Sequence, residues 1–355
     1  MTEQRRQLLR YAAAALAAGT ANAIGGQAWA LPVSNVSRMA STAALTPPRQ
    51  PRIYMILFRG ETPVEKGFRD YFAVNGMAPE LIVRDVALDV GKVPQLIAEA
   101  RAMQADLIYT WGTPVTLAVA GKAAAVNPAV HVTDIPVVFT MVAAPQASGL
   151  VASLASSGRN LTGASHVVPN NQQLSAIRAY RRFERIAIIF NPAEPNSVLN
   201  VKEWRALAAS EHFQLIEQPV PLDAKGQPSA AALPELVQAL AQRQVQLLYI
   251  GPDSFLAANR MALTEAALAA HLPTFSATEV ALREGKALFG LVSGYENVGR
   301  LTAHKAAQIL YQHVAPAQIP IETLARFSYL VNMSVASQLQ MYPPLKVINY
   351  AELMR

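Results

Sequence analysis

The sequence contains no cysteine. This absence excludes disulfides, thiolate metal sites, catalysis by a cysteine nucleophile and attachment of a lipid to an N-terminal cysteine. Histidine is also scarce, because the chain has only 6, and they show neither HxH nor HExxH spacing. We therefore expect neither a zinc site nor any other metal or cofactor.

Motifs for common enzymatic chemistry are missing as well. The chain has no GxSxG elbow, no GxxxxGK[ST] loop and no GxGxxG after its first predicted strand. Ser197 lies between a predicted strand and a predicted helix, but it lacks flanking glycines and no histidine can be assigned to it. We predict no catalytic residue, and an α/β enzyme such as a transferase is the least favoured interpretation.

Charge is low and evenly spread. Charged residues make up 15% of the chain, and the formal net charge of +6 comes without any basic run. A protein that follows a phosphate backbone needs such a run or patch. We therefore predict no binding to nucleic acid.

The N-terminus has the order of an export signal. The pair Arg5-Arg6 precedes an alanine-rich segment, Tyr11 to Gly26, which leads to Ala28-Trp29-Ala30. Paired arginines, an apolar stretch and small residues predict a twin-arginine signal over residues 1–30, cleaved near Ala30, and a periplasmic protein. The alternative is an uncleaved membrane anchor, but Asn22 and the glycines near residue 25 leave a short apolar run.

The rest of the chain is long enough for two domains. Cleavage removes three arginines and one glutamate, which lowers the formal charge from +6 to +4 and leaves 325 of the 355 residues. Residues 31–50 have no periodic pattern and close on Pro47-Pro48. We predict that they form a disordered linker.

From Pro51 the sequence alternates short apolar runs with amphipathic segments. Strands that are apolar on both faces and separated by helices predict parallel sheets covered on both sides. The predicted strands are 52–59, 81–86, 106–111 and 136–142, followed by 186–191, 215–220, 247–251 and 274–277. The predicted helices of the first half are 64–74, 93–104 and 113–119. The pattern therefore indicates two α/β lobes.

The junction over residues 185–201, RIAIIFNPAEPNSVLNV, shows where a ligand would bind. An apolar strand runs into Asn191 and Glu194, and then Asn196 and Ser197 open a helix. Unpaired N–H groups and the helix dipole make such a place suitable for a small polar or anionic molecule. Asn196 or Ser197 could instead be a simple helix cap.

Polar residues recur at the ends of the other predicted strands. Ligands of open α/β sheets collect outside the carboxyl ends of the strands. The candidate positions are Gly60 and Glu61; Trp111, Gly112 and Thr113; Thr140 to Ala144; Asn191 to Ser197; Asp253 and Ser254; Thr278 and Glu279. Each of them could also be a turn or cap residue.

Several segments in this order resemble those of ABC-transporter substrate-binding proteins, in the branch with tryptophan- and tyrosine-binding members. The segments are LIYTWGTPVTLAVAG, PVVFTMVAAPQASGLVASLASSGRNLTG, RIAIIFNPAEPNSVLNV, YIGPDSFL, PTFSATE and ALFGLVSGYENVGRLTAHKAAQIL. The resemblance runs from about Arg52 to the C-terminus. It implies a type I periplasmic-binding fold, in which two Rossmann-like lobes with parallel sheets, joined by three hinge crossings, close on a small solute.

The resemblance also implies how the chain divides. The N-terminal lobe would comprise 51–161 and 288–318, and the C-terminal lobe 162–287 and 319–355. The crossings would lie near Gly163, near Phe289 and at Pro316 to Pro320. We expect a monomer that delivers its solute to an ABC permease and that is not inserted in the membrane after cleavage.

Only some of the family's ligand-facing positions have matching residues in this chain. Gly112 and Thr113 match the small polar turn of the first lobe, and Asn196-Ser197 match the polar helix start of the second. Many similar proteins have an acidic residue before the proline after the fourth strand, where this chain has Ala143-Ala144-Pro145. The remaining candidate partners are the carboxylates Glu61, Glu194, Asp253 and Glu279, and the stacking aromatics Trp111 and Tyr295, each of which could instead be structural.

Two functions follow from this interpretation. The first is a periplasmic solute-binding protein that closes on a small polar or aromatic solute. The alternative is a ligand-sensing module that docks on a sensor kinase or a chemoreceptor.

Overall fold

The computed structural model describes residues 49–355. The predicted export signal and all but the last two residues of the predicted linker lie outside the described residues. None of the helices in residues 49–355 is both long and apolar enough to cross a membrane.

The first sheet has five parallel strands in the order β2-β1-β3-β4-β5. Its central strands are mainly apolar, as expected for strands covered by helices on both faces, and every residue of β3 and β4 is buried. The strands are β1 (Arg52–Leu57), β2 (Glu80–Asp85), β3 (Leu107–Trp111), β4 (Val137–Val142) and β5 (Leu161–Ser165).

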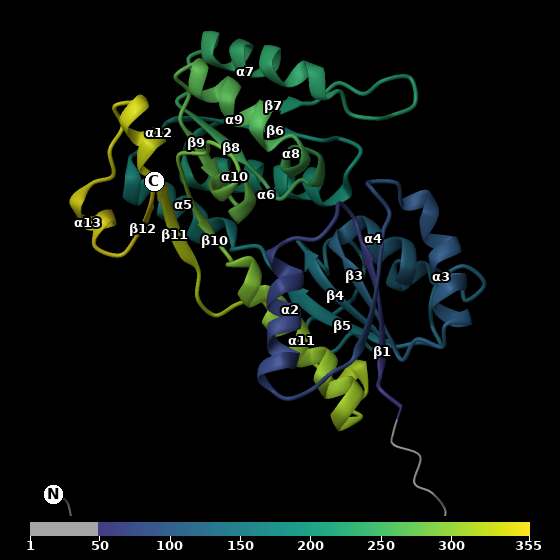
Figure 1. The fold of residues 1–355 in the computed structure, drawn as a ribbon. Coiled ribbons are helices and arrows are strands. Elements are labelled where there is room, and N and C mark those ends of the chain that lie inside the picture. Colours follow the sequence, from purple (N-terminus) through teal and green to yellow (C-terminus); the bar gives the residue numbers. More distant parts are fainter. Residues whose placement is uncertain (1–48) are drawn as a thin grey trace, which may run out of the picture. The chain divides into compact units, whose positions relative to one another are not determined.

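Four helices surround this sheet, three of them local and one from far along the chain (Figure 1). They are α2 (Pro63–Val74), α3 (Val93–Ala102), α4 (Gly112–Ala120) and α11 (Tyr295–Gln312). Helix α2 begins at a capping box, in which the Thr62 hydroxyl accepts from the Val64 N–H and the Glu65 carboxylate accepts from the Thr62 N–H. Helix α11 packs along α2 and against β4 and β5.

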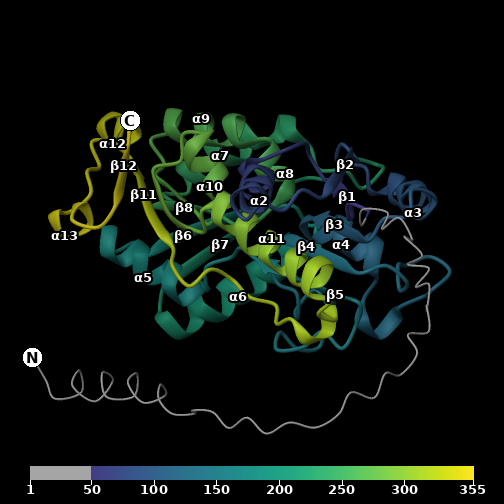
Figure 2. The same ribbon diagram turned by 60° about the horizontal axis from the view of Figure 1, so that its bottom comes forward.

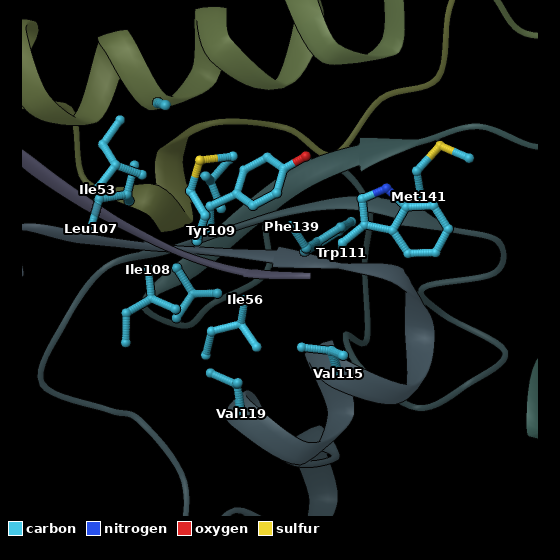
Figure 3. Packing of buried hydrophobic residues seen from close by; sticks show 14 of the residues in the cluster. Ile53, Ile56, Leu107, Ile108, Tyr109, Trp111, Val115, Val119, Phe139 and Met141 are labelled. Atoms are coloured by element: carbon cyan, nitrogen blue, oxygen red, sulfur yellow. The ribbon is translucent and has the colours of Figure 1, made fainter. Parts of the chain in front are cut away.

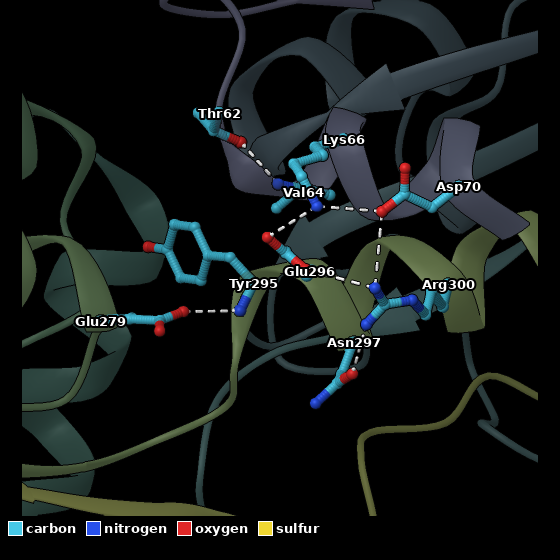
Figure 4. Close-up of polar contacts among 9 residues, drawn as sticks. All are labelled: Thr62, Val64, Lys66, Asp70, Glu279, Tyr295, Glu296, Asn297 and Arg300. Atoms are coloured by element: carbon cyan, nitrogen blue, oxygen red, sulfur yellow. Dashed lines mark hydrogen bonds and ion pairs between the residues drawn. The ribbon is translucent and has the colours of Figure 1, made fainter. Parts of the chain in front are cut away.

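Glycines allow α2 and α11 to approach each other closely. A Cβ on Gly299 would lie 1.9 Å from the Val64 carbonyl oxygen, and one on Gly67 would lie 2.0 Å from the Glu296 carbonyl oxygen. Ion pairs then bridge the two helices at the surface, from Lys66 to Glu296 and from Arg300 to Asp70 (Figure 4). Helix α11 is therefore an integral part of the first lobe.

The second sheet has the order β12-β11-β10-β9-β8-β6-β7, and all its pairs are parallel except β10 with β11. The strands are β6 (Arg185–Phe190), β7 (Gln214–Pro219), β8 (Leu247–Ile250), β9 (Thr274–Ser276), β10 (Phe289–Val292), β11 (Ser328–Asn332) and β12 (Glu352–Met354). The helices are α5 (Asn170–Tyr180), α6 (Pro195–Glu211), α7 (Leu233–Gln242), α8 (Ser254–Ala258), α9 (Arg260–Ala269), α10 (Glu279–Arg283), α12 (Met333–Gln338) and α13 (Leu345–Ile348).

Alternate residues of the central strands build two cores on opposite faces of this sheet. Ile186 and Ile188 of β6 pack with Trp204 of α6, whereas Ala187 and Ile189 pack with Val237 of α7. This is the two-residue period expected of a strand covered on both faces. Figure 2 shows α5 and α6 on one side of the strands and α7 and α9 on the other. The predicted fold class, two α/β lobes with parallel sheets, is confirmed.

The chain passes between the sheets three times. The residues near Gly163 and Phe289 that we expected at the first two crossings lie inside β5 and β10, so the passages follow these strands, at 166–169 and 293–294. Because β10 pairs with β9 and β11, the predicted return segment 288–318 divides between the lobes: β10 belongs to the second sheet and α11 to the first lobe.

The third passage, residues 313–327 between α11 and β11, contains the predicted crossing at Pro316 to Pro320 and lies beside the first passage where both leave the first sheet. The Ser165 N–H donates to the Glu322 carbonyl at 2.8 Å, and Ala164 forms a parallel bridge with Glu322. Lys305, which is 1% exposed, donates from Nζ to the Pro320 carbonyl and to the Glu322 carboxylate, both at 2.6 Å. These bonds tie α11 and both passages together.

Candidate ligand-binding site

A cavity lies between the carboxyl ends of the two sheets. Its volume is about 30 Å³, which is room for roughly two water molecules. A solute as large as an amino acid therefore enters only when the walls separate. The residues around the cavity are Arg59, Trp111, Thr113, Met141 and Ala143 of the first lobe, His166 of the first passage, Glu194, Asn196, Pro252, Asp253, Ser254, Ala257 and Thr278 of the second lobe, and Tyr295 of α11.

The first-lobe wall consists of Arg59, Trp111, Thr113, Met141 and Ala143, and it is completed by Tyr295 of α11. The indole of Trp111 stands at the edge of the buried cluster beside Met141 (Figure 3). The guanidinium carbon of Arg59 lies 5.0 Å from the centre of this ring, within cation–π range. Met141 has a φ of 56° at a register shift in β4, a backbone conformation that is uncommon outside glycine.

The second-lobe wall is organised by two buried carboxylates. Asp253 accepts from the Asn191 N–H at 2.7 Å, the Ser197 hydroxyl at 2.5 Å and the Leu256 N–H at 2.9 Å. Glu194 accepts from the Ser254 N–H at 2.9 Å and the Ser254 hydroxyl at 2.8 Å. Both carboxylates therefore lie at the start of α8: Asp253 is its N-cap residue, and the side chain of Glu194, the residue before α6, accepts from the first N–H of α8.

Burial sets the protonation of the groups around the cavity. It raises the pKa of Glu194 to about 7, and the negative charge of Asp253 acts in the same direction. Burial lowers the pKa of His166 to about 3, with a further contribution from the Arg59 charge, and raises the pKa of Tyr295 to about 12. At neutral pH His166 and Tyr295 are therefore uncharged, and Glu194 titrates.

Four polar side-chain atoms at the cavity are buried and have no hydrogen-bond partner within residues 49–355. They are Arg59 Nε, Trp111 Nε1, His166 Nδ1 and Asn196 Oδ1. Trp111, His166 and Asn196 are each no more than 6% exposed. Buried polar groups are almost always hydrogen-bonded, so this concentration marks a place where a ligand supplies the missing partners.

Ten of the candidate positions surround the cavity: Trp111, Thr113, Met141, Ala143, Glu194, Asn196, Asp253, Ser254, Thr278 and Tyr295. Three others support the walls from behind. Asn191 and Ser197 donate to Asp253, and Gly112 opens α4 with a φ of 81°. Tyr295 is held at the start of α11 because its N–H donates to the Glu279 carboxylate at 2.6 Å (Figure 4).

Four predicted positions lie away from the cavity. Glu61 is exposed and forms an ion pair with Arg69, and its neighbour Gly60 has a φ of 80° in the turn after β1. Thr140 is fully buried and accepts from the Thr302 hydroxyl at 3.1 Å. Glu279 faces Arg283 and the Tyr295 N–H rather than the cavity.

Sequence reasoning missed Arg59 and His166. The predicted strand 52–59 included Arg59, whereas β1 ends at Leu57, so Arg59 is itself a strand-end residue. His166 follows β5 in the first passage, which we had interpreted only as a connection. If the predicted first strand had ended at Leu57, the argument from strand ends would have selected Arg59. No local sequence pattern would have selected His166.

The family model that describes ABC transporter substrate binding proteins matches residues 77–354 of this chain. The chain belongs to this family. The tyrosine-binding protein of Clostridioides difficile (strain R20291) is 23% identical over 278 residues, which are 78% of this chain and 74% of that protein. The family is one of substrate-binding proteins, which agrees with the prediction of a non-enzymatic role.

Solved structures of similar fold have low sequence identity to this protein. A conserved domain protein from Vibrio cholerae superposes with a TM-score of 0.75 at 22% identity, covering 86% of this chain and 100% of that one. The ABC domain from Streptococcus pneumonia in complex with L-Trp gives a TM-score of 0.74 at 21% identity, with coverage of 86% and 100%. These likenesses confirm the type I periplasmic-binding fold.

Proposed function

We propose that the protein captures a small polar or aromatic solute in the cavity between its lobes and delivers it to an ABC permease. The observation that carries this proposal is the set of unpartnered buried atoms at the carboxyl ends of both sheets. Family membership and the names of the tyrosine-binding and L-Trp-bound proteins support the same assignment.

The lobes would close around the solute. Because the cavity holds only about 30 Å³, the walls must part before a solute enters and must close once it is bound. Binding energy would come from hydrogen bonds to Trp111, His166 and Asn196, which otherwise have buried atoms without partners. The closed form would be the one that the permease recognises.

A thermal-shift screen tests this proposal. A solute that binds only the folded state raises the Tm, so amino acids, aromatic acids, nucleosides, sugars and small dicarboxylates are screened against the purified protein. The variant Thr113→Ala with Asn196→Ala should abolish the shift. The matched control, Thr133→Ala with Asn171→Ala, changes exposed residues outside the cavity and should leave the shift unchanged. A shift that survives in the cavity variant would contradict the proposal.

The periplasmic location is a further part of the proposal. It depends on the twin-arginine pair Arg5-Arg6. Replacing both residues by lysine should stop export, which fractionation of cells into periplasm and cytoplasm measures. Unchanged delivery to the periplasm would contradict the twin-arginine route.

A further inference from the structure

Arg59 differs from the other arginines of the first lobe in having neither a carboxylate nor a carbonyl partner; Arg159, which also lacks a carboxylate, donates to three carbonyl groups. In the first lobe Arg52, Arg69, Arg84 and Arg101 each form an ion pair. Within residues 49–355 the Arg59 side chain makes no hydrogen bond or ion pair; its contact is with the Trp111 ring, and its Nε is buried without a partner. A half-buried guanidinium beside a cavity, without an internal counter-charge, favours an external one.

The helix start on the same wall adds to this preference. Helix α4 has nine residues and follows β3 directly, with Trp111 at the N-cap position and no side chain that caps it. Its first N–H groups therefore keep the partial positive charge of a helix start. Beside them, Trp111 Nε1 is a buried donor without a partner, and Thr113 lines the cavity.

The opposite wall carries the opposite chemistry. The carboxylates of Glu194 and Asp253 both accept from N–H groups of the first turn of α8, so protein carboxylates fill the place where an anion would bind there. Asn196 adds an acceptor atom without a partner. A carboxylate of a solute would be repelled there, whereas a hydroxyl or an amine would find acceptors.

We propose that the solute is a small organic acid whose carboxylate binds the first-lobe wall, at Arg59, Trp111 Nε1 and the Thr113 hydroxyl, and whose other end presents a hydrogen-bond donor to Glu194 and Asn196. This proposal rests on the proposed function and specifies its substrate class. Ala143 fits the same orientation, because it adds no charge to the wall that receives the carboxylate.

Calorimetric titration with matched probes tests the carboxylate requirement. The longer probes are L-tyrosine, 3-(4-hydroxyphenyl)propionate, the amide of that acid, and tyramine, and the shorter pair is glycolate and glycolamide. At least one acid should bind, and its amide or amine counterpart should bind about 10- to 100-fold more weakly, as expected for loss of a charged hydrogen bond. Equal affinity of acid and amide, or a folded protein that binds none of the acids, overturns the proposal.

Variants of Arg59 assign the carboxylate to this wall. Arg59→Gln should weaken binding of the acid about 10- to 100-fold, and Arg59→Lys, which keeps the charge, should recover part of the loss. The matched control is Arg84→Gln, because Arg84 also lies over an aromatic ring, that of Tyr54 at 5.9 Å, but away from the cavity. The control should bind like the original protein, and the Tm of each variant checks folding.

Asn196→Ala separates this proposal from the proposed function. If Asn196→Ala weakens binding and Arg59→Gln does not, the cavity is the binding site but the carboxylate assignment is wrong. If neither variant changes the affinity of a probe that binds, both proposals are wrong. Loss of affinity in both variants, with Arg84→Gln unchanged, supports both.

Discussion

The two walls of the cavity are built from the same junction, in which a parallel strand ends and a helix begins, but they carry opposite charge. On the first-lobe wall α4 starts without a side-chain cap, beside Arg59. On the second-lobe wall the carboxylates of Asp253 and Glu194 both accept from N–H groups at the start of α8. The same fold unit would therefore favour an anion or a cation, depending on which side chains lie at the helix start.

The walls also differ in how they are held. The second-lobe wall is held within one lobe, by hydrogen bonds that the Asn191 N–H and the Ser197 hydroxyl donate to Asp253. The first-lobe wall is completed by Tyr295, at the start of a helix that follows the second sheet and returns to pack on α2. The first wall therefore depends on packing between distant segments, and it is the easier one to disturb by a substitution remote from the cavity.

The largest effect is expected from Gly299→Ala. Its Cβ would lie 1.9 Å from the Val64 carbonyl oxygen, so α11 must move away from α2. We expect the free energy of unfolding to fall by about 3 kcal/mol, as for severe overpacking. Chemical denaturation measures the loss. The control Gly294→Ala places its Cβ 3.5 Å from Asn297 and should cost much less; equal loss in both variants would contradict the role of the close helix contact.

A pH-dependent effect is expected from Glu194→Gln. In the folded protein the pKa of Glu194 is about 7, above its ordinary value of 4.5. Between these two values only the folded state keeps the proton, so Glu194 makes the protein less stable as pH rises and reaches its full cost above pH 7. The variant removes this cost and should gain on the order of 2 kcal/mol relative to the original protein between pH 5 and pH 8.

Denaturation curves at several pH values measure this gain. The second-lobe wall would then be the one whose charge depends on pH near neutrality. A variant that loses stability with rising pH as steeply as the original protein would show that Glu194 is not the titrating group.

The smallest effect is expected from Glu61→Gln. The ion pair of Glu61 with Arg69 is exposed and outside the cavity, so it contributes at most about 1 kcal/mol. Affinity for a solute should stay within about 2-fold of the original value, and calorimetric titration measures it. A larger loss of affinity would show that Glu61 belongs to the first-lobe wall, although it lies outside the cavity.

The ends of the strands can be predicted well from the sequence, but the residues that form the cavity walls can be predicted only in part. Strand-end reasoning reaches Trp111 and Asn196 because each lies beside a parallel strand that is recognisable from its apolar run. It also selects Glu279, which faces away, since orientation at a strand end depends on tertiary bonds such as that to the Tyr295 N–H. Periodicity alone cannot predict the return of α11, because nothing local specifies that Gly299 meets Val64.

The bonds between the first and third passages determine which motions of the lobes are easy. Sliding one passage along the other would break the 2.8 Å bond from Ser165 to Glu322 and pull Lys305 from its carbonyl partner. Turning both passages together about their common direction keeps these bonds. These bonds would therefore favour rotation of the lobes about the paired passages over translation. An entering acid would first contact either the first-lobe wall, with Arg59, or the second-lobe wall, with Glu194. Rotation of the lobes would then bring the other wall into contact with it.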